Sequence, residues 1–389
     1  MSTPRVLHII TRLDAGGAAA NTLASVDLLR QHGFDTALAY GVTSDPDDRV
    51  APHLERMGVR SFFMPHLVRE VSPWQDLRTL RQTIRLIRQE RCDLVHTHCS
   101  KAGVTGRLAA RRCGVPAIHT PHGHIFYGYF GRWPTAAFVA IERRLARRTA
   151  RIVSLTNRET GESLERGIGW RDQYVTVPSG VPLARFRGIP AEAGRQFRGE
   201  LEIPDDAFLF VSVGRLVPVK GFDILLRAFA SATLGDRPAH LAIVGGGEEH
   251  ARLEALAREL KLHGRVRFAG HRPDVTPALS AASAFVMASR NEGMGRAFIE
   301  AMASGLPVIG TRVGGVPEFL KDRETGLLVE KEDPVSLAQA LRTLAGDAAL
   351  RTALGARAAA AVFPEYDERT MIERLAALYR DVLRAKKSP

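Results

Sequence analysis

The sequence predicts an α/β protein built from two doubly wound parallel sheets. Short apolar segments typical of buried strands alternate with helical patterns along nearly the whole chain of 389 residues, and this alternation favours parallel sheets. The alternation begins afresh at residue 208, after a stretch rich in proline and glycine. The length allows two or three domains, and a composition that is 45% hydrophobic and 25% charged is ordinary for a soluble globular protein.

The first half of the chain carries six segments that we expect to form strands. They are residues 6–10, 36–40, 60–64, 93–97, 116–120 and 151–155. The apolar segment 6–10 is too short for a signal peptide, and no segment is long enough to span a bilayer. The three cysteines form no C-x-x-C pair, and their number is odd. A protein of a reducing compartment, with free cysteines, is the simplest explanation of this pattern. We therefore expect a cytoplasmic protein.

The second half carries six more expected strands. They are residues 208–213, 241–244, 266–269, 284–287, 307–310 and 326–329. Prolines and glycines cluster between residues 180 and 204, as they often do in linkers. We therefore expect one domain at 1–185, a second at 190–368, and a final helix at about 369–389.

Positive charge is concentrated in the first half. Residues 1–190 contain 27 Lys and Arg against 16 Asp and Glu, which accounts for +11 of the net charge of +12. Two helical patterns carry arginine rows. The rows are Arg78, Arg81, Arg85 and Arg88 in the first, and Arg143, Arg144, Arg147, Arg148 and Arg151 in the second. Each row alone fits a solvated helix face, but the pair in so basic a half also suits an anionic partner, with membrane and nucleic acid both open.

The histidines of the first half could suggest a metal site. They are His96, His98, His119, His122 and His124. Their spacings match no standard zinc site, and no cysteine pairs with them. We therefore expect no bound metal.

Candidate ligand-binding residues follow the expected strands directly. Parallel sheets bind ligands at the carboxyl ends of their strands. Gly16-Gly17 follows the first strand, Arg215 and Lys220 follow 208–213, and the stretch R-N-E-G-M-G-R-A-F-I-E follows 284–287. Glycines and cations of this kind suit a diphosphate group.

The order of these motifs resembles the family 4 glycosyltransferases, of the retaining GT-B type. The motifs are H-T-P-H-G-H (119–124), S-G-V (179–181), G-R-L-x-x-x-K-G (214–221), E-G-M-G-x-x-x-x-E-A-M-A-S-G-L-P-V (292–308) and G-G-V-P-E (314–318). The resemblance implies a GT-B fold, in which two Rossmann-like doubly wound domains face a central cleft. It also implies that the first domain binds the acceptor, that the second binds the nucleotide sugar, and that the final helix packs back onto the first domain.

The two glutamates of the longest motif acquire roles from this resemblance. Glu292 would accept hydrogen bonds from hydroxyls of the donor sugar, because a carboxylate makes strong charge-assisted bonds. Backbone N–H groups of Gly293, Met294 and Gly295 would approach the sugar and its phosphate. Glu300 lies eight residues on, about 12 Å along a helix, and would bind the ribose hydroxyls.

The cations and the histidine motif complete the implied donor site. Arg215 and Lys220 would stabilise the charge that grows on the departing diphosphate, in place of a metal ion. The resemblance therefore implies no metal requirement and no cofactor besides the nucleotide-sugar substrate, UDP- or GDP-linked. His122 would lie near the donor sugar, where it could orient a hydroxyl or assist proton movement, and both roles stay open. Gly16 and Gly17 would also contact the donor.

The implied acceptor contacts and the S-G-V motif are less regular. His124 and either Tyr127 or Tyr129 would border the acceptor. Ser179 stands where asparagine is commoner, which leaves the role of that loop undecided.

We therefore expect an enzyme that transfers a sugar from a nucleotide to a hydroxyl acceptor with retention of configuration. The basic first half suits a lipid-linked or lipopolysaccharide-type acceptor at an anionic membrane surface on the cytoplasmic side. The alternatives are a sugar-nucleotide epimerase of the same shape and a non-catalytic protein that binds sugar nucleotides or nucleic acid. Nucleic acid is the weakest of these partners, because no basic patch with interleaved aromatic residues is present.

Overall fold

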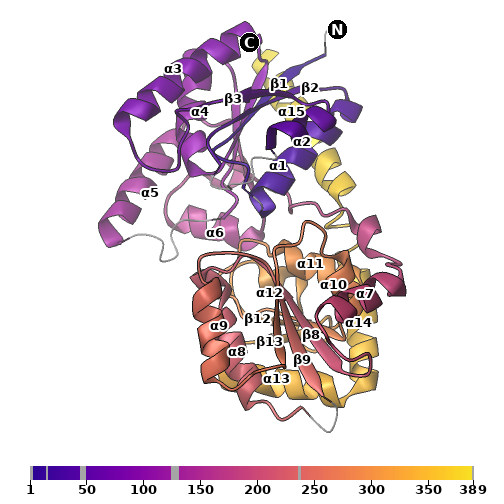
Figure 1. Cartoon of the computed structure of the whole chain (residues 1–389). Helices are drawn as coiled ribbons and strands as arrows, with labels where there is room; N and C mark the ends of the chain where they lie inside the picture. The colour runs from indigo at the N-terminus through magenta and orange to yellow at the C-terminus, as the bar shows by residue number, and fades with distance from the viewer. Residues whose placement is uncertain (1–2, 15, 44–49, 124–130, 235–237, 388–389) are drawn as a thin grey trace. The chain divides into compact units, whose positions relative to one another are not determined.

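The computed structural model describes residues 3–14, 16–43, 50–123, 131–234 and 238–387 (Figure 1). The chain divides into two compact units: Met1–Gly180 with Glu368–Pro389, and Val181–Asp367. Each unit contains one parallel sheet, so the predicted fold class of two doubly wound Rossmann-like units is confirmed. The chain leaves the first unit at Gly180, a few residues before the sequence-based boundary, and returns to it at Glu368.

The sheet of the first unit has seven parallel strands in the order β3-β2-β1-β4-β5-β6-β7. They are β1 (Arg5–Ile10), β2 (Asp35–Tyr40), β3 (Arg60–Phe63), β4 (Leu94–His98), β5 (Ala117–Thr120), β6 (Arg151–Ser154) and β7 (Tyr174–Thr176). Strand β7 has no counterpart among the predicted strands, because its three half-buried residues are too few to show a periodic pattern. The strand order reverses between β1 and β4, which is where such sheets bind ligands.

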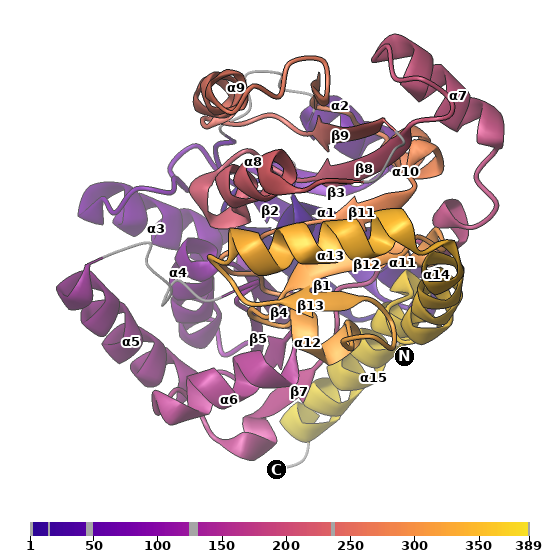
Figure 2. The same ribbon diagram turned by 90° about the horizontal axis from the view of Figure 1, so that it is seen from below.

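Helices cover both faces of this sheet (Figure 2). They are α1 (Gly17–Leu28), η1 (Leu29–His32), α2 (Val50–Arg56), α3 (Pro73–Gln89), α4 (Ser100–Arg112), α5 (Arg132–Ala146), α6 (Asn157–Glu165), η2 (Arg171–Gln173) and α15 (Glu368–Lys387). Helices α3 and α4 pack on one face, through a cluster that includes Leu86 and Ala109. The other face packs against α1 and α15, and Leu375 and Tyr379 of α15 are buried there.

The second unit has a six-stranded parallel sheet in the order β10-β9-β8-β11-β12-β13. The strands are β8 (Phe208–Val213), β9 (Ala239–Val244), β10 (Val266–Gly270), β11 (Ala284–Val286), β12 (Val308–Thr311) and β13 (Leu327–Val329), and all six match predicted segments. The helices are η3 (Leu183–Phe186), α7 (Ala191–Glu200), η4 (Pro218–Lys220), α8 (Phe222–Ser231), α9 (His250–Glu259), α10 (Thr276–Ala281), α11 (Arg296–Ala303), α12 (Val316–Phe319), α13 (Pro334–Gly346) and α14 (Ala348–Val362). The order reverses between β8 and β11, so the ligand-binding edge of this sheet lies after these two strands.

The two arginine-rich segments differ from their predicted form in detail. Helix α3 exposes its arginine row as expected. Its apolar row is Leu77, Leu80, Ile84 and Ile87, which repeat at helical spacing, but Leu77 is 38% exposed whereas the other three pack against the sheet. Leu77 shares the outer surface with Trp74, whose ring lies 4.6 Å beneath the Arg78 guanidinium. Helix α5 ends at Ala146, and Arg151 is not on it, because this residue begins β6. No helix in the described part of the chain combines the length and apolar content needed to cross a membrane.

Candidate functional site

The loops after β8 and β11 bring Lys220 and Glu292 together. The Nζ of Lys220 at the end of η4 donates to Oε1 of Glu292 at 2.7 Å. The Ser289 hydroxyl donates to the same oxygen, also at 2.7 Å. No group among the described residues donates to the other carboxylate oxygen, Oε2. Glu292 is 8% exposed. In this mostly buried carboxylate Oε1 is already hydrogen-bonded, whereas Oε2 is available to a ligand.

Two glycines allow the backbone to pack closely around this pair. Gly221 follows Lys220 with φ +64°, and a Cβ there would lie 1.9 Å from the carbonyl oxygen of Ala288. Gly314, after β12, has φ +49°, and its Cβ would lie 1.7 Å from the carbonyl oxygen of Glu292. The N–H of Gly315 also donates to the carbonyl of Gly293 at 3.0 Å. The G-G-V-P-E motif therefore packs closely against the backbone of the Glu292 loop and is hydrogen-bonded to it.

Arg290 ties the Glu292 loop to η4 and α8. Its guanidinium donates to both carboxylate oxygens of Asp223 at 2.9 and 2.8 Å, and to the carbonyl of Pro218 at 2.6 Å. A further bond of 2.5 Å reaches Glu332. Burial would raise the pKa of Asp223, but the hydrogen bonds and charge of Arg290 outweigh burial and lower it. This network holds the Lys220 and Glu292 segments against each other.

Arg215, the second predicted cation, stands apart from the pair. It is exposed just after β8, and within the described part of the chain no carboxylate forms an ion pair with it. A cation in this position is available to an anionic ligand.

Glu300 lies on α11 with its side chain 17% exposed. Burial raises its pKa, while the charges of Arg296 and Arg185 oppose that rise. The Nε of Arg296 is 4.0 Å from a carboxylate oxygen of Glu300, so Arg296 lies beside the predicted ribose ligand. Gly295 is the N-cap residue of α11, with φ +81°. Met294 is 3% exposed, so its side chain belongs to the core and only its backbone can face a ligand.

The remaining predicted residues belong to the first unit. Gly16 and Gly17 are exposed at the start of α1, at the end of the connection that follows β1. His122 lies in the loop after β5 with φ 59°, and the N–H of the next residue, Gly123, donates to the buried Glu159 carboxylate at 3.2 Å. His124, Tyr127 and Tyr129 lie outside the described residues.

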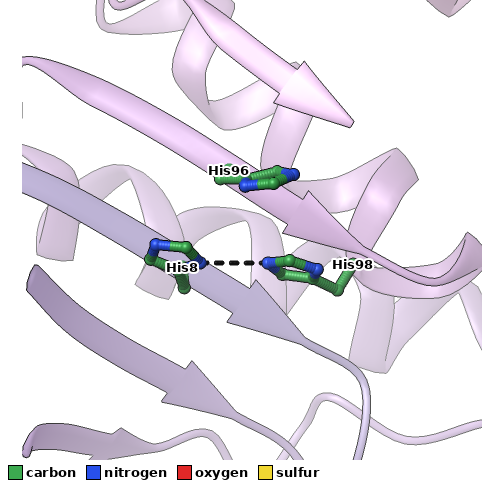
Figure 3. A group of neighbouring side chains, drawn as sticks. All are labelled: His8, His96 and His98. Atoms are coloured by element: carbon green, nitrogen blue, oxygen red, sulfur yellow. Dashed lines mark hydrogen bonds between the residues drawn. The ribbon is translucent and has the colours of Figure 1, made fainter. Parts of the chain in front are cut away.

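His122 is hydrogen-bonded to a row of buried histidines, of which Figure 3 shows His8 and His98 with their neighbour His96. Its Nε2 is 2.9 Å from Nδ1 of His98, and Nε2 of His98 is 3.0 Å from Nδ1 of His8. Strands β1 and β4 pair so that His8 lies opposite His96. Alternate residues of both strands point to the face of the sheet that α15 covers. His96 lies on this face too, bonded to Tyr379 of α15 at 2.5 Å and to Thr120 at 2.8 Å. Burial lowers the pKa of His8 and of His122 to about 3.

Sequence reasoning missed three parts of this arrangement: the Ser289 bond to Glu292, the Arg290 network and the histidine row. A signal for the row does exist, because His96 and His98 stand two apart on one strand and therefore share a face. The partners His8 and His122 lie 90 and 24 residues from His98, so only the strand order brings them together.

Comparisons with known proteins agree with this geometry. Residues 195–361 match the family described as "Glycosyl transferases group 1", and residues 4–180 match a "Glycosyl transferase 4-like domain". The chain is 36% identical over 287 residues to a D-inositol 3-phosphate glycosyltransferase of Streptomyces avermitilis, an alignment that covers 69% of this chain and 61% of that protein. It is 32% identical to an Escherichia coli UDP-Gal:alpha-D-GlcNAc-diphosphoundecaprenol alpha-1,3-galactosyltransferase, with 89% of each chain covered.

A solved structure shows the same fold. The crystal structure of Anabaena HepE in complex with UDP and glucose superposes with a TM-score of 0.84 at 20% identity, covering 97% of this chain and 100% of that one.

Proposed function

Because the chain belongs to the group 1 glycosyltransferases, we propose that it transfers a sugar from a nucleotide-linked donor to a hydroxyl acceptor, with retention of anomeric configuration. The observation that carries this proposal is the Lys220–Glu292 pair, which lies after β8 and β11, where the strand order of the second unit reverses. A cation and a carboxylate at one edge suit a ligand that carries both phosphate and hydroxyl groups.

Each partner of the pair has a separate task in this proposal. The Oε1 atom of Glu292 orients Lys220 toward the leaving diphosphate, and Oε2 accepts a hydrogen bond from a hydroxyl of the donor sugar. Arg215 supplies a second positive charge, since no carboxylate among the described residues neutralises it. Negative charge grows on the diphosphate as the bond to the sugar breaks, and fixed cations stabilise that charge without a metal ion.

The nucleoside part of the donor extends along α11. Glu300 lies about one and a half turns beyond Gly295 at the N-terminus of α11 and is mostly buried, which suits hydrogen bonds to the two ribose hydroxyls. The name of the Escherichia coli relative states a UDP-linked donor, and HepE was crystallised with UDP. A UDP- or GDP-linked sugar is therefore the donor class that we propose.

The acceptor that we propose is lipid-linked and is met at an anionic membrane surface on the cytoplasmic side. The name of the Escherichia coli relative specifies a diphosphoundecaprenol acceptor. In this chain, α4 packs against both α3 and α5, which lie on one side of the first unit in both views (Figures 1 and 2). Helix α3 exposes Trp74 (59%) beneath Arg78, and α5 exposes Trp133 (85%) in its first turn, next to Arg132 in the sequence. Exposed tryptophan with arginine is typical of surfaces that bind the membrane interface.

A panel of nucleotide sugars tests the proposal directly. The correct donor stabilises the folded state by about 2.7 kcal/mol at a hundredfold excess over its Kd, so the melting temperature should rise by several degrees for UDP- or GDP-linked sugars. With that donor, free nucleotide should appear only when an acceptor is present, and the product should keep the anomeric configuration of the donor. Conversion of the donor without acceptor would instead favour the epimerase.

A further inference from the structure

His8, His98 and His122 form a continuous chain of imidazole rings in the first unit. Nδ1 of His8 lies 3.0 Å from Nε2 of His98, and Nδ1 of His98 lies 2.9 Å from Nε2 of His122. Neighbouring rings along the chain are nearly parallel, at 11° and 27°. The chain runs from the fully buried β1 to the half-buried loop that follows β5.

The hydrogen bonds along this row of imidazole rings must all point the same way, because each ring is neutral. Burial lowers the pKa of each ring, and the neighbouring His96 and His119 are buried and neutral for the same reason. Tyr379, which bonds to His96, has its pKa raised by burial and keeps its proton. A neutral imidazole has one N–H donor and one bare acceptor nitrogen. Both bonds of the chain therefore run in the same direction.

The buried end of the chain decides that direction. Nε2 of His8 is inaccessible and has no hydrogen-bond partner among the described residues. If the chain ran inward from His122, this atom would carry an N–H with no acceptor, and orphaned N–H groups are rare in protein interiors. If the chain runs outward from His8, the buried end is a bare lone pair. The unsatisfied N–H then lies on Nδ1 of the half-buried His122, which has no partner among the described residues and is not among the inaccessible unpartnered atoms.

We propose that His98 and His8 are positioning residues that hold His122 with its proton on Nδ1, so that His122 donates a hydrogen bond to a substrate oxygen and does not act as a base. In this arrangement Nε2 of His122 accepts from His98, and Nδ1 carries the proton, so no lone pair remains to remove a proton from a substrate hydroxyl. The inference rests on the proposed function for the identity of the ligand. It chooses between the two roles that the sequence left open for His122.

The hydrogen-bonded chain accounts for the histidines better than a metal ion does. One nitrogen from each of His8, His96 and His98 lies within 4.8 Å of the others, which is close enough to suggest a metal site. Five of the six nitrogens of these rings already make hydrogen bonds, and only Nε2 of His8 is unbonded. A metal held by all three rings would break at least two of those bonds.

Nitrogen NMR of the ¹⁵N-histidine-labelled full chain tests the direction of the chain. The spectrum contains 13 histidines, and comparison with His122→Asn assigns the His122 signals. We expect Nδ1 of His122 to be protonated and Nε2 to be bare, which is the reverse of the tautomer that free histidine prefers in water. In His98→Gln the amide can still donate to His122 and accept from His8, so the tautomer should persist, whereas His98→Leu should release it.

Three results that can be measured without catalytic activity would overturn the inference. They are a proton on Nε2 of His122, an unchanged tautomer in His98→Leu, and stoichiometric Zn²⁺ binding to the wild type that His8→Phe abolishes. None of these measurements needs catalytic activity, so they remain decisive if no sugar donor is found and the proposed function fails.

Turnover supplies the functional readout. With the correct donor, His98→Leu should lower kcat by about 10-fold, the rate effect of losing one hydrogen bond made in the transition state. His98→Gln should retain most of the activity. UDP affinity should be unchanged in both variants, because the Lys220–Glu292 pair lies in the other unit. Equal kcat losses in the Gln and Leu variants would reduce His98 to a packing role and contradict the inference.

Discussion

Replacing Gly314 by alanine should displace the Glu292 loop and disable the proposed donor site. The added Cβ would lie 1.7 Å from the carbonyl oxygen of Glu292, whereas real Cβ atoms essentially never come within 3.0 Å of such an atom. One of the two segments must therefore move by about 1.3 Å. The loop carries the carboxylate that holds Lys220 at 2.7 Å, so this movement breaks the geometry of the pair. A misplacement of about 1 Å can cost about 10²-fold in turnover, and we expect a loss of this order for Gly314→Ala.

Gly264→Ala is the matched control for this substitution. Gly264 also has a positive φ, of +73°, but an added Cβ there meets nothing within 4 Å. Both substitutions cost about 1–2 kcal/mol of stability from the left-handed backbone alone, so both should lower the melting temperature. Only Gly314→Ala adds the steric displacement and should lose UDP affinity, measured by titration calorimetry, and nucleotide release in the presence of acceptor. Wild-type turnover in Gly314→Ala would refute the reasoning, because the Glu292 loop would then tolerate displacement or play no part in catalysis.

Three further predictions concern the charges of the proposed site and surface. Lys220→Ala should lower kcat by about 10²-fold beyond any loss of donor affinity, and EDTA should leave the wild type active; activity that EDTA abolishes and Mg²⁺ or Mn²⁺ restores would contradict the metal-free mechanism. Glu300→Gln should weaken UDP binding by about 1–3 kcal/mol in calorimetry while the melting temperature holds, and unchanged binding would exclude the ribose role. Charge reversal on α3 and α5 should release the protein from vesicles of acidic lipid, to which each arginine contributes about 1 kcal/mol, screened over about 8 Å at physiological salt. The residues changed to glutamate are Arg81 and Arg85 on α3, Arg144 on α5 and Arg148 just beyond the end of α5. Equal binding to neutral and acidic vesicles, or loss of UDP binding in the reversed variant, would exclude the membrane surface.

The strands could be predicted well because their signal is local. A buried parallel strand is a continuous apolar segment such as Phe208–Val213, and its residues need no knowledge of their neighbours to be identified. Where that signal weakens, prediction failed: β7 offers three half-buried residues, and Leu77 follows the apolar row of α3 yet lies on its outer surface. Periodicity shows which residues share a helix face, but the position of the sheet decides how much of that face is buried.

The candidate site could be predicted as residue types at strand ends, but not as contacts. Lys220 and Glu292 follow expected strands, so the sequence places both at the same edge of the second sheet. Their 2.7 Å bond spans 72 residues and requires β8 to lie beside β11. Nothing local in the sequence shows that adjacency, nor that Arg290 would bridge to Asp223 across 67 residues.

The sequence by itself therefore determined the fold class, the strand segments and the chemical types of the site residues, because hydrophobic periodicity and turn residues act over a few positions along the chain. Only the tertiary structure decided which polar groups meet. The hydrogen bond between His8 and His98 depends on β1 and β4 pairing in register, and the solvent exclusion that keeps both rings neutral depends on α15 closing over that face of the sheet. Desolvation and hydrogen-bond geometry are properties of three-dimensional packing, so no reading of residue order contains them.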